Sequence, residues 1–226
     1  MKKILMMVAV LATAICANAQ YEPGTISIQP YIGANGATLT NMEKFPVYDK
    51  MADNQAIGGS VVGVDFEYQV TNFLGLSAGI NYSMQGTGWK DTKLTIDSES
   101  MECKDIKMET GYFNIPVIAN IYLYKGLAIK GGVQFGFLTN ADFKYTEEAK
   151  IDSRKVTQNT SVEMKDDFKK VDISIPIGIS YEFNNHLVLD ARYNLGLSKV
   201  NKVSEAGEKD CKNSVFRLTL GYKIGL

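Results

Sequence analysis

The residues of this 226-residue chain best able to do chemistry are charged side chains set singly among apolar ones. In DISIPIGISYEF (172–183) the charges fall on one side of a period-two alternation, and large apolar residues fill the other side. Acids and bases on this side are nearly balanced. Because a charge taken out of water must be paired and hydrogen-bonded, we expect a network of ion pairs facing an interior. A gated or proton-conducting polar path is the functional alternative. The candidates are Asp65, Glu67, Lys130, Asp172, Glu182, Asp190, Arg192, Arg217 and Lys223.

Recognisable catalytic chemistry is otherwise scarce. The single histidine, His186, follows Asn184-Asn185 in an expected tight turn and has no obvious carboxylate to orient it, so we interpret it as a plain turn residue. The chain has no Gly-x-Ser-x-Gly, HExxH, phosphate-loop or CxxC motif. Its acidic clusters lack EF-hand spacing. We therefore predict no catalytic residue, no cofactor and no metal site, and the near-neutral net charge of −1 gives no indication of nucleic-acid binding.

The first residues have the three parts of a secretory signal. Lys2 and Lys3 form a positive start, residues 4–15 are apolar, and Ala17-Asn18-Ala19 is an A-x-A cleavage site. We expect cleavage after Ala19, leaving residues 20–226 as one mature domain. No later stretch approaches the roughly 18 apolar residues of a membrane helix, so the sequence predicts export without a helical anchor.

Two cysteines remain after removal of the signal and its Cys16. Cys103 and Cys211 lie in two expected long loops, in an oxidising compartment where disulfides form. A bridge between them would strap the two loops together and stabilise the fold by a few kcal/mol. Sequence spacing cannot fix the connectivity, so a disulfide and two separate thiols both stay open.

Period-two alternation recurs along the whole mature chain and predicts its architecture. Tight Asn/Gly turns connect some of the alternating segments, and long polar loops at about 37–57, 90–108, 141–169 and 201–213 connect the others. Short turns on one end and long loops on the other are typical of an up-and-down barrel. The sequence thus predicts an all-β, eight-stranded antiparallel barrel, whose strands cover residues 26–35, 62–70, 74–84, 113–123, 127–137, 172–183, 187–198 and 216–226.

The character of the polar face separates a membrane barrel from a soluble one. That face is mainly Gly, Ser and Asn, which suit the inside of a narrow barrel, whereas the other face carries large Ile, Leu, Val, Phe and Tyr, which suit lipid. We therefore expect every second residue from Ile173 to Phe183 to face lipid, and the residues that alternate with them, from Asp172 to Glu182, to face the lumen. Interfacial girdles would explain the aromatic residues expected near strand ends, which are Tyr68, Trp89, Tyr112, Tyr181 and Phe183.

Two hairpins echo each other, and each contains a proline. Residues 114–136 align without gaps on 174–196, so that Pro116 matches Pro176. Because proline cannot donate to a ladder, we expect each to flank a bulge or the start of irregular pairing near the outer rim.

Several segments carry a family resemblance. YFNIPVIANIYLY, GLAIKGGVQFGFL, LVLDARYNLGL and SVFRLTLGYKIGL resemble the small outer-membrane β-barrel family of Bacteroidetes, known as PorT-like or "porin family". The terminal Thr219-x-Gly221-x-x-Ile224-x-Leu226 is similar to the C-terminal recognition signal of outer-membrane barrels, with aliphatic residues where aromatics are commoner. The resemblance implies an eight-stranded barrel and brings no catalytic residues with it.

The leading functional hypothesis is a non-enzymatic integral protein of the outer membrane. It would have a plugged polar lumen, periplasmic termini, and long outer loops with a structural or partner-binding role. The expected partners are outer-membrane lipid, the barrel-assembly machinery during biogenesis, and an extracellular or secretion-complex partner. A narrow porin-like channel and an accessory part of a secretion complex are the alternatives, and an outer-membrane hydrolase or acyltransferase is disfavoured by the position of His186.

Overall fold

The computed structural model describes residues 21–41, 45–47, 50–96, 99–124, 126–151, 154–202 and 210–226. The expected signal segment, with its cleavage after Ala19, lies outside these residues. None of the helices found among them has the length and apolar character needed to cross a membrane.

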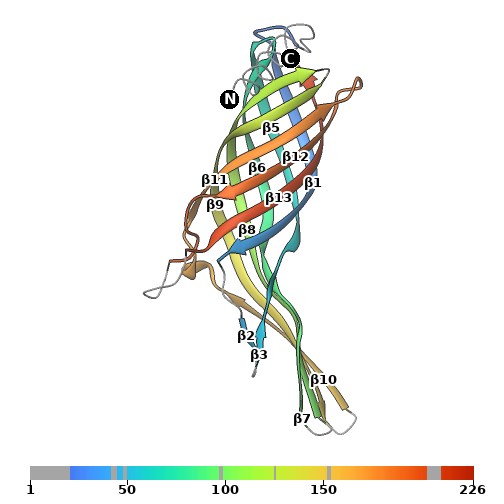
Figure 1. The fold of residues 1–226 in the computed structure, drawn as a ribbon, viewed down its shortest axis with the longest axis vertical. Helices are drawn as coiled ribbons and strands as arrows, with labels where there is room; N and C mark the ends of the chain where they lie inside the picture. The colour runs from blue at the N-terminus through green and yellow to red at the C-terminus, as the bar shows by residue number, and fades with distance from the viewer. Residues whose placement is uncertain are drawn as a thin grey trace, which may run out of the picture.

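Eight antiparallel strands close into a ring (Figure 1). Each strand pairs with its neighbours in the order β1-β5-β6-β8-β9-β11-β12-β13, and β13 pairs back onto β1. The predicted eight-stranded antiparallel barrel is therefore confirmed, and closure leaves no ladder edge exposed around the ring. The strands are β1 (Ile26–Thr40), β5 (Ile57–Thr71), β6 (Leu74–Trp89), β8 (Glu99–Tyr124), β9 (Leu127–Ile151), β11 (Val171–Glu182), β12 (Leu187–Gly196) and β13 (Lys212–Tyr222), with β14 (Ile224–Gly225) continuing the pairing onto β1.

The two faces of the ring differ as the alternation predicts. On β11, Ile177 and Ile179 are 55% and 57% exposed, whereas Ser180 and Glu182 on the other parity are buried. The same holds on β13, where Phe216 and Leu218 point outward and Arg217 lies inside. A water-soluble barrel would reverse this arrangement, so the outer surface is built for an apolar surrounding.

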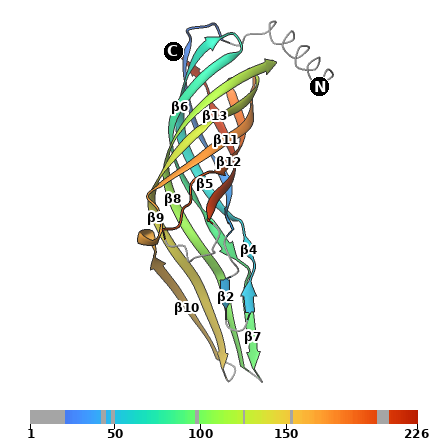
Figure 2. The same ribbon diagram turned by 60° about the vertical axis from the view of Figure 1, so that its left-hand side comes forward.

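Two strands of the ring, β8 and β9, continue far beyond it. β7 (Thr92–Ile96) pairs with the start of β8, and β10 (Arg154–Glu163) pairs with the end of β9, giving a sheet in the order β10-β9-β8-β7. We call this four-stranded part the outer sheet. It projects from the end of the barrel opposite the C-terminus (Figures 1 and 2). The prediction of polar loops at 90–108 and 141–169 is therefore wrong for most of both ranges. Strands paired outside the ring do not need an apolar face, so their sequence does not show the alternation by which the other strands were recognised.

Shorter elements gather where the outer sheet leaves the ring. They are β2 (Phe45–Val47) paired with β3 (Lys50–Ala52), β4 (Asn54–Gln55) paired with β6, and the single-turn 3-10 helix η2 (Lys165–Asp167).

The inward-facing residues change from polar to apolar along the barrel axis. On β6 the buried positions run from Ser77 and Asn81 to Trp89, and on β8 they run from Asn120 and Asn114 to Met108. At the end that carries the outer sheet, these side chains form a hydrophobic cluster, which we call the apolar cap. Its members are Leu39, Ala52, Trp89, Cys103, Ile106, Met108, Tyr112, Leu138, Ala141, Phe168 and Val200.

The apolar cap corrects two assignments of aromatic residues. Trp89 and Tyr112 are 2% and 1% exposed and lie in the cap, so their prediction as interfacial girdle residues is wrong. Tyr68, Tyr181 and Phe183 are exposed on the outer surface. The alternation explains why these two groups of residues differ in exposure, since Trp89 and Tyr112 occupy inward-facing positions of β6 and β8.

Pro116 and Pro176 flank no bulge in their ladders, but each lies beside a short stretch of irregular pairing, so the prediction is confirmed only in its second form. Both lie within strands and face inward, and the ladder on one side of each proline is continuous. On the other side the pairing is interrupted for two residues without any change of register, between β8 and β6 at Pro116 and between β11 and β9 at Pro176. A short interruption is enough to absorb the missing N–H donor.

Candidate functional site

The candidate functional site is the polar lumen, where the predicted charges gather. All nine are buried, and they come from β5, β9, β11, β12, β13 and the residue between β13 and β14. Period two places them inside the ring, and the curvature of the closed sheet brings together strands that are distant in sequence.

A central group is built around Arg192. Its Nη2 lies 3.1 Å from Asp65 Oδ2 and its Nε lies 2.7 Å from Asp190 Oδ1. Lys130 Nζ contacts the other oxygen of Asp190 at 2.7 Å. Tyr31 donates its hydroxyl hydrogen to Asp65 Oδ1 at 3.4 Å. Two carboxylates therefore form ion pairs with two cations in the middle of the barrel.

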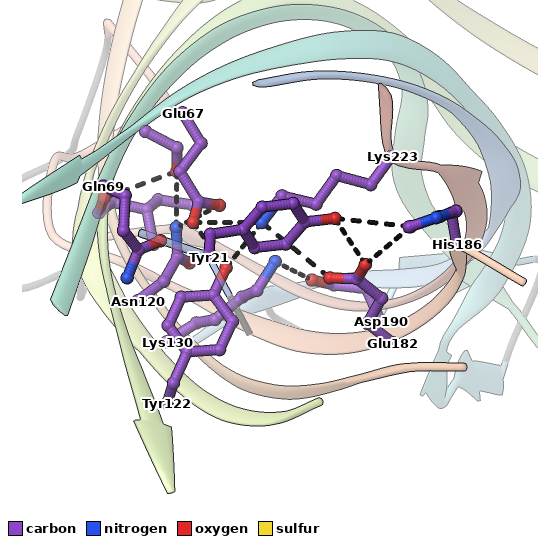
Figure 3. Close-up of polar contacts among 12 residues, drawn as sticks. Tyr21, Glu67, Gln69, Asn120, Tyr122, Lys130, Glu182, His186, Asp190 and Lys223 are labelled. Atoms are coloured by element: carbon purple, nitrogen blue, oxygen red, sulfur yellow. Dashed lines mark hydrogen bonds and ion pairs between the residues drawn. The ribbon is translucent and has the colours of Figure 1, made fainter. Parts of the chain in front are cut away.

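A second group lies at the end of the lumen near the C-terminus and is centred on Lys223 (Figure 3). Lys223 Nζ lies 3.1 Å from Glu67 Oε1 and 3.9 Å from Glu182 Oε2, and it donates to Tyr122 Oη at 2.7 Å. The Tyr122 hydroxyl donates in turn to Glu67. Lys223 thus lies between two carboxylates, and the group fills this end of the lumen with paired charges.

Tyr21 and His186 complete this end of the lumen. The Tyr21 hydroxyl donates to Glu182 Oε1 at 2.6 Å, and Lys223 Nζ lies 4.6 Å from the centre of the Tyr21 ring. His186 Nδ1 lies 3.3 Å from Glu182 Oε1. The interpretation that His186 lacks an orienting carboxylate is therefore wrong. His186 adopts a left-handed φ of 65° at this turn.

A histidine and a carboxylate do not by themselves make a hydrolytic site. In the described part of the chain, His186 forms side-chain hydrogen bonds with Tyr21 and Glu182, and neither a serine nor a cysteine is among its partners. The Tyr21 hydroxyl is already used as a donor to the carboxylate. This arrangement holds Tyr21 across the end of the lumen.

Uncharged polar residues continue the hydrogen-bond network of the lumen towards the apolar cap. Asn114 Nδ2 donates to Asn81 Oδ1 and to Ser83 Oγ, each at 3.0 Å. Further along, Asp172 accepts hydrogen bonds from Ser198 Oγ at 2.5 Å and Asn213 Nδ2 at 2.9 Å. Sequence reasoning missed these amides and the two tyrosines, Tyr21 and Tyr122. Inward parity would have indicated Tyr122 and Asn114, but no pattern indicates Tyr21, which lies outside any strand.

Among the residues that the structure describes, no group of side chains is suited to a metal ion. Within the described ranges, no three His, Cys, Asp or Glu side chains gather closely enough to hold an ion. Cys103 and Cys211 are both thiols in the structure, Cys103 within the apolar cap and Cys211 packed against it.

The outer sheet carries a separate polar pocket of about 610 Å³. Beside it, Glu109 receives Lys107 Nζ at 2.7 Å and Lys144 Nζ at 2.5 Å. Burial alone would raise the pKa of Glu109, but the hydrogen bonds from the two lysines outweigh it and lower the pKa. The pocket is lined by Asp105, Lys107, Lys144, Tyr145, Thr146, Asn159, Thr160 and Ser161.

Comparison with known families gives one match over most of the chain. A family model described as "Outer membrane protein beta-barrel domain" matches residues 18–202. A search of curated proteins finds no match.

Three of the solved structures that match this chain have a low sequence identity to it. Ail of Yersinia pestis, solved with the heparin analogue sucrose octasulfate, is 12% identical, with 89% of this chain and 99% of that chain covered and a TM-score of 0.42. Neisserial surface protein A is 12% identical, with 88% and 97% covered and a TM-score of 0.44. OprG of Pseudomonas aeruginosa is 10% identical, with 92% and 99% covered and a TM-score of 0.38.

Proposed function

The chain belongs to the outer membrane protein β-barrel domain family and is an integral barrel of the outer membrane, and from that premise we propose that it is a closed, non-enzymatic anchor displaying the outer sheet as a binding platform. In this proposal the outer sheet faces the exterior, and both termini and the short turns face the periplasm. Cleavage after Ala19 and assembly by the barrel-assembly machinery belong to the same proposal. So does membership of the PorT-like group of Bacteroidetes, which rests on the resemblance of the strand segments.

The observation that carries the proposal is the continuation of β8 and β9 beyond the ring. On β9 the pairing with β11 ends at Phe137, and 14 further residues follow to Ile151. At about 3.3 Å per residue they extend roughly 45 Å. Such a length is unnecessary for crossing a bilayer, which takes about 9–11 residues per strand. The excess is a paired, polar sheet held away from the membrane, which suits contact with an external partner.

The contents of the lumen favour an anchor over a channel. At one end the ion pairs of Lys223 and the Tyr21 ring occupy the interior, and at the other end the apolar cap does so. An eight-stranded ring is only wide enough for side chains to fill. An ion would have to displace Trp89 or Tyr112 from the cap, and both side chains are almost fully buried.

A narrow channel is the second candidate, because charged residues follow one another along the lumen. Lys223, Lys130 and Arg192 with their carboxylate partners could pass a small ion if the cap opened. Single-channel recording in planar bilayers distinguishes the two functions. The anchor predicts no conductance steps from the unmodified protein, whereas regular steps would favour the channel.

The polar pocket identifies the part of the platform best suited to a ligand. Hydroxyl, amide, ammonium and aromatic groups from β8, β9 and β10 line one side of the outer sheet. Such a mixture fits a polar ligand, such as a glycan or a hydrophilic protein loop, better than an apolar one.

The test is removal of the two hairpin tips. Residues 93–102 and 144–161 each have a pair at their base, since Lys93 pairs with Glu102 and Lys144 pairs with Ser161. The second range supplies six of the eight residues that line the polar pocket. A variant with a two-residue turn in place of each tip keeps the Met108–Phe143 pair of the remaining sheet. We expect it to keep its heat-dependent gel mobility and to lose binding to arrayed glycans and extracellular proteins. Equal binding by both proteins, or none by the full chain, would contradict the platform.

A further inference from the structure

Arg217 differs from the other charged residues of the lumen. It lies on β13, faces inward and is 2% exposed. Its guanidinium carbon lies 5.7 Å from the centre of the Tyr31 ring. Within the part of the chain that the structure describes, its Nε and Nη2 have no hydrogen-bond partner. A buried guanidinium without an anion is costly, because it has lost its hydration and gained no counter-charge.

The carboxylates around Arg217 are already engaged. Asp65 is held by Arg192, and Asp190 is held by both Arg192 and Lys130. Three cations, Lys130, Arg192 and Arg217, therefore share two carboxylates in the middle of the barrel, so this central group has one more positive than negative charge. Glu67 and Glu182 are taken by Lys223, and Asp172 accepts hydrogen bonds from Ser198 and Asn213.

Two further unused donors flank Arg217 across its ladders. Asn35 of β1 pairs with Arg217 on one side, and Arg192 of β12 pairs with it on the other. Directly opposed residues of antiparallel strands have Cβ atoms only about 5 Å apart on the same face. Asn35 Nδ2 and Arg192 Nη1 are both buried and also have no hydrogen-bond partner among the described residues.

We propose that a small monovalent inorganic anion, with chloride as the probe, binds in the lumen between Arg217, Asn35 and Arg192. One negative charge balances the excess positive charge, and the neighbouring N–H groups supply the hydrogen bonds that a buried anion needs. A narrow eight-stranded interior favours a single compact ion over a large organic one. The bound ion belongs to the folded barrel and stabilises it by mass action.

The experiment compares barrels refolded in sodium chloride and in sodium gluconate at equal ionic strength, so that the buried site fills during folding. The midpoint of heat-dependent gel mobility measures stability. We expect the midpoint of the unmodified protein to be higher in chloride by roughly 5–10 °C once chloride exceeds its Kd about 100-fold. The variant R217M removes the charge, so its midpoint should be the same in both salts. The variant K90Q, which alters an exposed cation outside the lumen, should keep the full chloride effect.

A second measurement does not depend on the folding of a variant. Crystals of the unmodified protein grown in bromide should show an anomalous peak within hydrogen-bond distance of Arg217 and Asn35. The proposal is overturned if the unmodified protein has one midpoint in both salts and bromide gives no such peak, because water alone then occupies the site. It is equally overturned if R217M keeps the chloride effect, or if bromide binds only elsewhere.

Discussion

Arg192 on β12 and Asp65 on β5 are separated by 127 positions in sequence, yet Arg192 Nη2 donates to Asp65 Oδ2 at 3.1 Å inside the barrel. The two strands are not neighbours in the ring, so this contact crosses the lumen. With Asp190 on its other side, Arg192 links carboxylates from two walls of the barrel. Contacts of this kind hold the interior together independently of the strand ladders.

Replacing Arg192 with alanine should destabilise the barrel strongly. The variant leaves Asp65 and part of Asp190 buried without a cation, and removal of one partner from a buried pair costs about 3–5 kcal/mol. Urea unfolding in lipid vesicles measures the loss. The matched control is Lys90→Ala, which breaks the exposed Lys90–Asp53 pair and should cost at most about 1 kcal/mol. Similar losses for the two variants would mean that the Arg192 pairs contribute no more than surface charges.

The apolar cap should contribute both stability and closure. Trp89→Ala removes an almost fully buried ring and should lower the free energy of unfolding by about 3–5 kcal/mol, because a cavity remains. Tyr68→Ala, which removes a ring from the outer surface, should cost less, since it leaves no cavity. In planar bilayers the unmodified protein should show no steps. Equal losses for Trp89→Ala and Tyr68→Ala would argue against a packed cap.

Protein lacking residues 1–19 should contain two titratable thiols when it is denatured without reductant, because Cys103 and Cys211 are not bonded to each other. In the folded protein Cys103 should react slowly. Burial, followed by the charges of Glu147 and Asp91, raises the pKa of its thiol, so little thiolate forms near neutral pH. Its alkylation rate should therefore rise with pH, as followed by mass spectrometry. A single mass corresponding to a bridged form would contradict this expectation.

The Glu109 carboxylate should make the outer sheet weakly acid-sensitive. Its pKa is lowered in the folded protein, so its contribution is present above the ordinary carboxyl range and is lost as pH falls through the folded pKa. Because the group is partly exposed, the effect should not exceed about 1 kcal/mol. Hydrogen exchange of the sheet between pH 7 and pH 3 measures it. Glu109→Gln should remove part of the pH dependence, and an unchanged dependence would show that other groups cause it.

Sidedness can be measured with single cysteines in a background lacking Cys103 and Cys211. Thr157→Cys lies on the exposed face of β10, and Asn184→Cys lies in a short turn at the other end of the barrel. A membrane-impermeant maleimide on intact cells should label position 157 and reach position 184 only after the outer membrane is opened. The reverse pattern would invert the proposed orientation.

The strand pattern of the ring could be predicted from sequence alone. Period two in eight segments predicted the number of strands, their antiparallel order and the face that each apolar residue occupies. It placed Ile179 outside and Arg217 inside because a side chain on a strand has only two directions to take. The same logic selected the charges of the lumen.

The alternation could not predict how far along the barrel axis a residue lies, or which residues meet across the ring. Parity says that Trp89 and Tyr112 point inward, but only the closed ring places them together in a cap at one end. Outer strands such as β10 have water on both faces, so no alternation distinguished them from loops. The sequence by itself determined the ring and its two faces, because these follow from local backbone geometry. The tertiary structure decided which charges pair, why Arg217 has no carboxylate of its own, and how far the outer sheet extends, because these depend on contacts across the closed barrel and on pairing between distant segments.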